Sequence, residues 1–174
     1  MNLSFQINCE TQEQFIEHWS LKYRDPNEEK YENNIGKPMT EKSRQELFEW
    51  KNGGIISKRK QESIVENYPL IFLGDKEKRY LSHKEGGGAI WNIFYLHCLE
   101  PDKYLIFDQH TYRAMKYIQT GKIIEISNSD KEKYRIYKDQ YIPFHNLFRY
   151  EHDRKVDKAL FAFGQFLKKV NKYL

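Results

Sequence analysis

Cysteine is scarce in this chain of 174 residues, which also lacks long hydrophobic runs and a large excess of charge of one sign. The two cysteines, Cys9 and Cys98, lie far apart and fit neither a disulfide framework nor the spacing of a zinc site. Two thiols are also too few for a four-cysteine iron–sulfur cluster. The histidines show no spacing with carboxylates that is typical of metal ligands. We therefore expect a protein of a reducing compartment with no metal and no cofactor.

Membrane proteins and strongly basic polyanion binders are also disfavoured. No cleavable signal heads the chain, and its apolar runs are too short to span a bilayer. The formal net charge is +4, from 29 Lys and Arg against 25 Asp and Glu. This mild surplus is compatible with a nucleic-acid partner but does not require one. We expect a cytoplasmic protein that is not inserted in a membrane.

Aromatic residues, by contrast, are abundant, at 16% of the chain. The length predicts a single helical domain, residues 1–174, made of two closely packed lobes. Apolar spacing and cap residues predict helices at about 11–24, 40–54, 57–68, 89–99, 108–118 and 154–174. Polar residues and breakers predict a loop at 25–39. The fold class is therefore mainly α, a bilobal helical bundle.

Three details of this pattern are more specific. Residues 1–10 alternate as a short strand or an extended lead-in would, and 123–126 form a short apolar run with an extended character. In the helix at 57–68, Ile64 and Val65 are expected to point inward. Gly164 interrupts the last helix at a cost of roughly 1 kcal/mol relative to alanine. It therefore predicts a close contact with another helix.

The block at residues 80–118 is the most informative part of the sequence. It contains "GGGAIWNIFYLHCLEPDKYLIFDQHTYRAM", in which three glycines open an apolar helix and a short loop leads to Asp108, His110 and Arg113. This stretch resembles the helix-hairpin-helix DNA glycosylase superfamily of base-excision enzymes. In that family a Gly-x-Gly hairpin opens a hydrophobic helix, and a loop then delivers an aspartate followed by histidine and arginine. The matching part is roughly a fifth of the chain.

The resemblance implies a helix-hairpin-helix motif, a duplex DNA backbone as partner, and an aspartate that acts in removal of a base. Asp108 would be the catalytic carboxylate. The residues implied in DNA binding are Lys84, Gly86, Gly87 and Gly88. Those implied in the substrate pocket are Trp91, Tyr95, His110 and Tyr112.

Physical chemistry makes this layout reasonable apart from the resemblance. Glycines allow positive φ and let a phosphate approach backbone N–H groups, and the start of the following helix adds partial positive charge. Such a turn holds phosphate without reading sequence. A carboxylate beside an extruded nucleotide can stabilise positive charge at the anomeric carbon or orient a water molecule. Flipping the base costs a few kcal/mol, which aromatic stacking offsets.

The block departs from the family pattern at several positions. Family members that also cut the strand carry a lysine for a Schiff base where this chain has Ile90, so we expect no lyase step. The usual Leu-Pro-Gly lead-in is replaced by Lys84-Glu85-Gly86, and a small alanine is replaced by Asn92. The acidic Glu85 would repel a phosphate.

Several of these residues have an equally simple structural interpretation. Asp108 would also serve as an N-cap, which is compatible with catalysis. Trp91 and Tyr95 share one helical face typical of core packing, and Arg113 suits a structural ion pair. The basic cluster at 57–63 is typical of a solvated helix face, with additional DNA contact as the second interpretation. The burial of Trp50 is expected.

These observations predict a DNA-binding protein resembling a monofunctional base-excision DNA glycosylase. It would hydrolyse the N-glycosidic bond with Asp108 and without a lyase step. The irregular hairpin and the mild charge also fit a catalytically silent nucleic-acid- or protein-binding module on the same scaffold. A structural or interaction protein with no nucleic-acid role is the third alternative.

Overall fold

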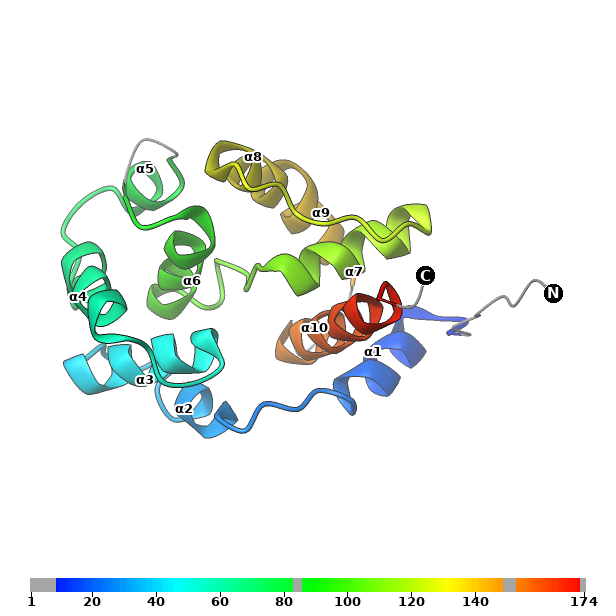
Figure 1. Ribbon diagram of the computed structural model, residues 1–174, viewed down its shortest axis with the longest axis horizontal. Coiled ribbons are helices and arrows are strands. Elements are labelled where there is room, and N and C mark those ends of the chain that lie inside the picture. The colour runs from blue at the N-terminus through cyan, green and yellow to red at the C-terminus, as the bar shows by residue number, and fades with distance from the viewer. Residues whose placement is uncertain (1–8, 83–85, 149–152, 173–174) are drawn as a thin grey trace. The chain divides into compact units, whose positions relative to one another are not determined.

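The computed structural model describes residues 9–82, 86–148 and 153–172. Helices follow one another through these ranges, which contain no strand (Figure 1). The helices are α1 (Gln12–Ser20), α2 (Glu28–Glu32), α3 (Glu41–Asn52), α4 (Lys58–Asn67), α5 (Lys76–Tyr80), α6 (Ala89–Leu99), α7 (Gln109–Thr120), α8 (Asp130–Ile136), the π-helical turn η1 (Tyr137–Tyr141), α9 (Ile142–His145) and α10 (Asp153–Val170). The predicted mainly α-helical class is confirmed.

The helix starts follow from local capping. The hydroxyl of Thr40 accepts from the Ser43 amide and the Ser43 hydroxyl accepts from the Thr40 amide, which forms a capping box at α3. Ser57 caps α4 with its hydroxyl group, which accepts from the Lys60 amide. Because a cap satisfies amides that the helix leaves free, these hydroxyl residues fix where each helix begins. The predicted starts at Thr40 and Ser57 are confirmed.

Two local predictions differ from the structure. The segment 25–39 is not entirely loop, because it contains the short helix α2, whose Tyr31 is buried in the core. Residues 123–126 lie in neither a helix nor a strand, so their extended character stays a prediction. Ile64 of α4 is buried as expected, but Val65 is half exposed. The predicted lead-in at 1–10 falls largely on residues 1–8, outside the described residues.

The chain divides into two compact units. One, here called the terminal unit, comprises Met1–Arg24, Gln109–Glu125 and Pro143–Leu174. The other, the central unit, comprises Asp25–Asp108 and Ile126–Ile142. The block at 80–118 is thus divided between Asp108 and Gln109. The glycines and Asp108 belong to the central unit, whereas His110, Tyr112 and Arg113 belong to the terminal unit.

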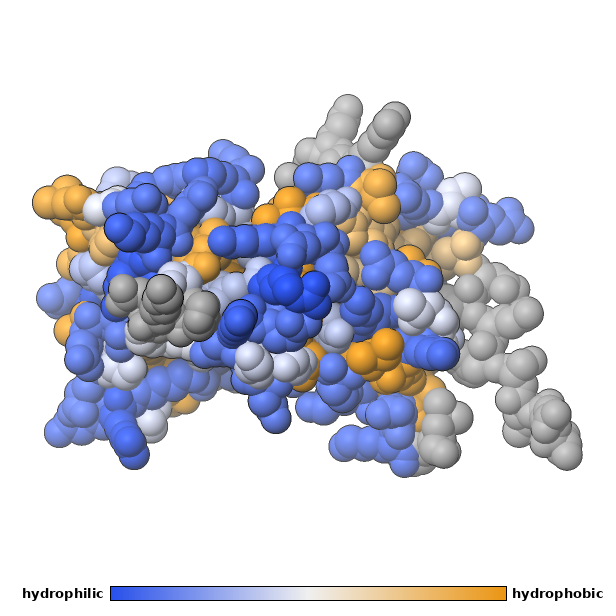
Figure 2. Space-filling view, turned by 90° about the horizontal axis from the view of Figure 1, so that it is seen from above, coloured by the Kyte–Doolittle hydropathy of each residue, from blue (hydrophilic) through white to orange (hydrophobic). Residues whose placement is uncertain are grey.

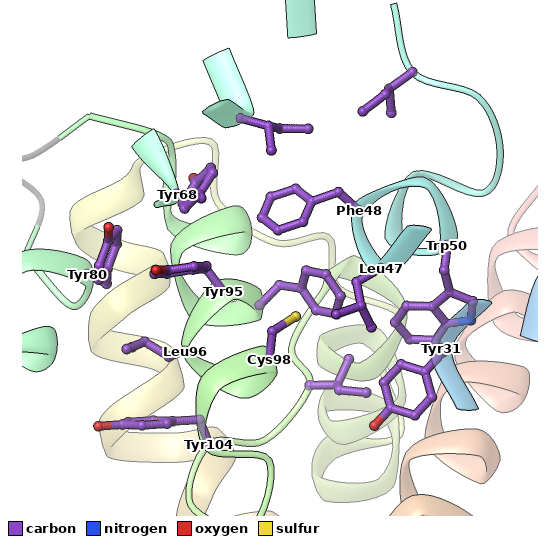
Figure 3. Close-up of a cluster of buried hydrophobic side chains, with 14 residues drawn as sticks. Tyr31, Leu47, Phe48, Trp50, Tyr68, Tyr80, Tyr95, Leu96, Cys98 and Tyr104 are labelled. Atoms are coloured by element: carbon purple, nitrogen blue, oxygen red, sulfur yellow. The ribbon is translucent and has the colours of Figure 1, made fainter. Parts of the chain in front are cut away.

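The core of the central unit is built around α6. This helix is apolar on all sides, and its residues from Asn92 to Cys98 are buried, as expected for a helix enclosed by others. Side chains from α2, α3, α4 and α5 surround it, and Figure 3 labels four of the aromatic ones, Tyr31, Phe48, Trp50 and Tyr80. Trp50 is buried there, as predicted, and its indole N–H donates to Glu28 at 3.0 Å. The central unit is therefore a core of aromatic residues arranged around one helix.

The terminal unit consists mainly of α1, α7 and α10, which lie side by side (Figure 1). Phe163 of α10 contacts Phe15 of α1 edge to face at 5.4 Å and Tyr117 of α7 at 5.7 Å between ring centroids. Beside it, Gly164 approaches the backbone of α7 so closely that a Cβ would lie 2.0 Å from the carbonyl oxygen of His110. The predicted close helix contact at Gly164 is confirmed.

Hydrophilic side chains cover most of the face shown in Figure 2, with hydrophobic patches between them. The most exposed large hydrophobic residues in the described ranges include Ile55, Ile71 and Leu73. No helix in the described part of the chain has the length and apolar character needed to cross a membrane.

Substitution of Gly164 by alanine should destabilise the terminal unit. The added methyl group has no room against His110, and overpacking of this kind costs about 1–3 kcal/mol or more, which exceeds the roughly 1 kcal/mol gained in helix propensity. We expect the midpoint of thermal unfolding, followed by circular dichroism, to fall by several degrees. Gln165→Ala, one residue further along α10, is the control and should leave the midpoint unchanged. An unchanged midpoint for Gly164→Ala would contradict the close approach.

Candidate nucleic-acid interface and carboxylate site

The glycine turn before α6 has a backbone that other residues cannot adopt there. Gly87 has φ +102° and Gly88 has φ +75°. A Cβ on Gly87 would lie 2.4 Å from the Tyr68 hydroxyl oxygen and 2.5 Å from Asn92 Oδ1. Both the conformation and the lack of space therefore require glycine at position 87.

Asn92 and Tyr68 hold this turn in place. The Asn92 amide donates to the Gly86 carbonyl at 3.2 Å and to the Tyr134 hydroxyl at 2.7 Å. The Tyr68 hydroxyl lies within hydrogen-bond distance of both the Gly87 carbonyl, at 2.8 Å, and Asn92 Oδ1, at 2.7 Å. Burial raises the pKa of Tyr68, so it remains a donor at neutral pH. Asn92, which departs from the family pattern, thus has a clear structural role.

The start of α6 presents backbone N–H groups but also lies near a carboxylate. Gly88 occupies the N-cap position and provides no side-chain hydrogen bond, which leaves first-turn amides available to a ligand or to water. Asp130 Oδ2 lies 3.8 Å from the position of a Cβ on Gly88. Asp130 is ion-paired with Lys133 at 2.9 Å, which offsets its charge. An anion at this helix start would therefore meet partial positive charge, an acid and a lysine together.

Asp108 follows a segment, Leu105–Phe107, that side chains of the π-helical turn η1 contact. The Tyr137 hydroxyl accepts from the Leu105 amide at 3.0 Å and lies 3.4 Å from the Leu105 carbonyl. The Phe107 ring, directly before Asp108, packs on Tyr137 and Tyr141 at 5.6 and 5.0 Å between centroids. Side chains of η1 thus replace the backbone partners that this extended segment lacks, and they fix the position of Asp108.

The carboxylate of Asp108 is paired with Lys51, which the sequence did not predict. Lys51 Nζ donates to Asp108 Oδ2 at 3.1 Å, and the side chains are only 7% and 12% exposed, respectively. The Lys51 ammonium also lies 5.6 Å from the centre of the Phe94 ring. Lys51 comes from the last turn of α3, and no local pattern links it to a residue so far along the chain. Only the packing of α3 beside α6 brings the two charges together.

The two aromatic candidates of α6 differ in their surroundings. Tyr95 is fully buried, and its hydroxyl donates to the Pro69 carbonyl at 2.5 Å, so it contributes to the core. Trp91 is half-buried. Its ring stacks on Phe48 at 5.4 Å between centroids, and the Lys60 ammonium lies 3.9 Å from its centre. A base could stack on this ring only if Lys60 moved aside.

The remaining candidates belong to the terminal unit. Arg113 donates to both carboxylate oxygens of Glu125, at 2.9 and 2.6 Å, and to the Gly164 carbonyl at 2.9 Å. This interaction lowers the pKa of Glu125, and the structural interpretation of Arg113 is confirmed. The His110 ring contacts Arg113 at 3.1 Å and Phe161 at 4.9 Å between centroids. Tyr112 is buried, with Lys116 5.7 Å from its ring centre.

Lys84 and Glu85, the lead-in to the predicted hairpin, lie outside the described residues. The helix-hairpin-helix motif therefore stays a prediction. Among the residues that the structure does describe, no group of histidine, cysteine, aspartate and glutamate is arranged to hold a metal ion. No protein-family model, curated protein or solved structure matches the chain.

The Lys51–Asp108 pair should contribute measurably to stability. Removing one partner of a buried ion pair costs about 3–5 kcal/mol, and the slight exposure of Asp108 places the expected loss at the lower end. We expect the losses for Lys51→Met and Asp108→Leu to add up to more than the loss for the double variant, with a coupling of about 1–3 kcal/mol. Urea unfolding of the four proteins measures it.

The pair Lys42–Glu46, also on α3 and 3.8 Å apart, is the more exposed control, with side chains 85% and 29% exposed. Its coupling in the same cycle should not exceed about 0.5 kcal/mol. Equal couplings for the two pairs would show that Lys51 and Asp108 do not interact as the structure indicates.

Proposed function

We propose that this protein binds duplex DNA and removes a damaged or mismatched base by hydrolysis of the N-glycosidic bond, with Asp108 as the essential carboxylate. The observation that supports this proposal is the position of Asp108 relative to the glycine turn along α6. Lys51, the partner of Asp108, lies against Phe94. Phe94 is six residues after Gly88, which corresponds to about 9 Å of helix. The glycine turn thus lies at the start of α6, and the Lys51–Asp108 pair borders the same helix at Phe94.

The arrangement suits the chemistry in three respects. The turn is held by Asn92 and Tyr68, so it needs no reordering when a phosphate arrives. The segment before Asp108 is fixed by Tyr137, so the carboxylate is oriented before a nucleotide enters. In the reaction, the carboxylate would stabilise positive charge at the anomeric carbon while the base departs, and a water molecule would complete the hydrolysis.

Strand cleavage is not part of the proposal. Position 90, where strand-cutting members of the resembled family carry an amine, is Ile90. Without an amine there, the Schiff base of the usual lyase route does not form at this position. The product of the reaction should be an intact strand with an abasic site.

The second candidate is a catalytically silent nucleic-acid-binding module on the same scaffold. The Lys51–Asp108 ion pair favours it, because a carboxylate already paired with an ammonium group has less capacity to stabilise a second positive charge. In this alternative the glycine turn still contacts phosphate, and Asp108 serves only to join α3 to the segment before α7.

Activity is tested on duplexes that each carry one deaminated, oxidised, alkylated or mismatched base. We expect the wild-type protein to produce abasic sites on at least one duplex, visible as strand breaks only after treatment with hot alkali. Asp108→Asn should reduce the single-turnover rate by about 100-fold or more, because it removes the charge that stabilises the transition state. The rate is measured by gel electrophoresis of an end-labelled strand.

Glu49→Gln is the matched control, since it removes another carboxylate of the central unit that is paired with a lysine and is 11% exposed. It should retain the wild-type rate or exceed it. Undiminished product from Asp108→Asn would remove Asp108 from the mechanism. DNA binding by the wild type without product on any duplex would support the silent module instead.

A further inference from the structure

We infer that the first turn of α4, Lys58-Arg59-Lys60, is a second binding surface for the nucleic-acid backbone, which holds the strand that approaches Asp108. This inference rests on the proposed function and adds to it the residues that would supply most of the binding. In the sequence, the basic residues of this turn are equally well explained as a solvated helix face. Its surroundings in the structure favour a ligand.

The positive charge on this turn interacts unfavourably with the dipole of its own helix. Ser57 caps α4, and the first turn contains no acidic residue. Three cations therefore lie at the end of the helix that already carries partial positive charge, an arrangement that destabilises a helix. Lys58 and Arg59 are exposed, and within the described residues neither forms an ion pair, although Glu62 follows one turn later. An anionic partner would relieve this accumulation of positive charge.

Lys60 is held in a fixed position beside the start of α6. Its ammonium donates to Asn52 Oδ1 at 2.7 Å and lies 3.9 Å from the centre of the Trp91 ring. Burial lowers the pKa of Lys60. Because Trp91 is in the first turn of α6, the cationic end of α4 and the glycine turn are neighbours in the same unit. The surface that would contact phosphate thus extends from Gly88 to Lys58.

The same contacts connect the basic turn to the candidate carboxylate. Asn52, the partner of Lys60, follows Lys51, which binds Asp108 at 3.1 Å. The end of α3 therefore lies between the basic turn of α4 and Asp108. Since Lys51 offsets the charge of Asp108, the carboxylate repels an approaching phosphate less than a free carboxylate would.

A nucleic-acid backbone fits this surface better than a lipid surface does. An interfacial helix needs an apolar face that it can insert into the bilayer. Of the two apolar residues of α4, Ile64 is buried in the core of the central unit, and only Val65 is exposed, which does not form an apolar face. The basic turn thus offers the positive charge that contacts backbone phosphates.

The test compares two variants of equal charge change. Lys58→Glu/Arg59→Glu alters the proposed surface, and Lys131→Glu/Lys138→Glu alters two exposed lysines of α8 and η1 in the same unit. Binding of a fluorescent duplex is measured by anisotropy between about 50 and 200 mM salt, the range over which phosphate binding is strongly weakened. For the α4 variant we expect roughly tenfold weaker binding at low salt and a salt slope smaller by about 0.9 for each phosphate that the variant no longer neutralises. The control should retain nearly the wild-type slope.

Each outcome has a distinct meaning. If the wild type binds duplex and the two variants weaken equally, the α4 surface is excluded while the proposed function stands. If the wild type binds no duplex at any salt concentration, both the α4 surface and the proposed function are excluded. The third measurement uses vesicles that contain anionic lipid. If the α4 variant alone loses vesicle binding while its duplex binding is unchanged, the surface binds a membrane and the inference is overturned. Neither variant should unfold at a lower temperature, because the acidic replacements at the start of α4 suit the helix dipole.

Discussion

The ion pair between Lys51 and Asp108 is the interaction on which the rest of the candidate site depends. It joins the last turn of α3 to the residue that precedes α7, and both side chains are almost fully withdrawn from solvent. Two charges in such a place are stable only together, since either alone would carry an uncompensated desolvation cost. The pair therefore fixes the end of α3, and with it Asn52, Lys60 and the basic turn of α4.

Two networks of neutral hydrogen bonds complete this arrangement. Asn92 and Tyr68 hold the glycine turn at one end of α6, and Tyr137 of the π-helical turn holds the segment before Asp108. In both cases a side chain satisfies backbone groups that no helix pairs. Such irregular backbone is stable only where these partners are supplied, and π-helical turns occur frequently at functional sites. The proposed function uses these two irregular segments of the central unit.

Much of the helical architecture could be predicted from local sequence. Thr40 and Ser57 mark helix starts because their hydroxyl groups pair with free amides nearby in the chain, and the apolar run 89–99 coincides with α6. Gly164 predicted a close contact because glycine inside a helix is costly unless space requires it. The short helix α2 was not predicted, since its polar residues lie between breakers and its stabilising contacts are distant in sequence, among them the burial of Tyr31 and the bond from Trp50 to Glu28.

The sequence by itself determined the longer helices, the caps at Thr40 and Ser57 and the glycine turn, because these depend on residues a few positions apart. It also determined that position 90 offers no amine. Only the tertiary structure decided that Lys51 meets Asp108, that Asn92 fastens the turn, and that Lys60 covers Trp91. These contacts join residues distant along the chain, and their partners are selected by the packing of α3 and α4 around α6, which no local pattern of residues encodes.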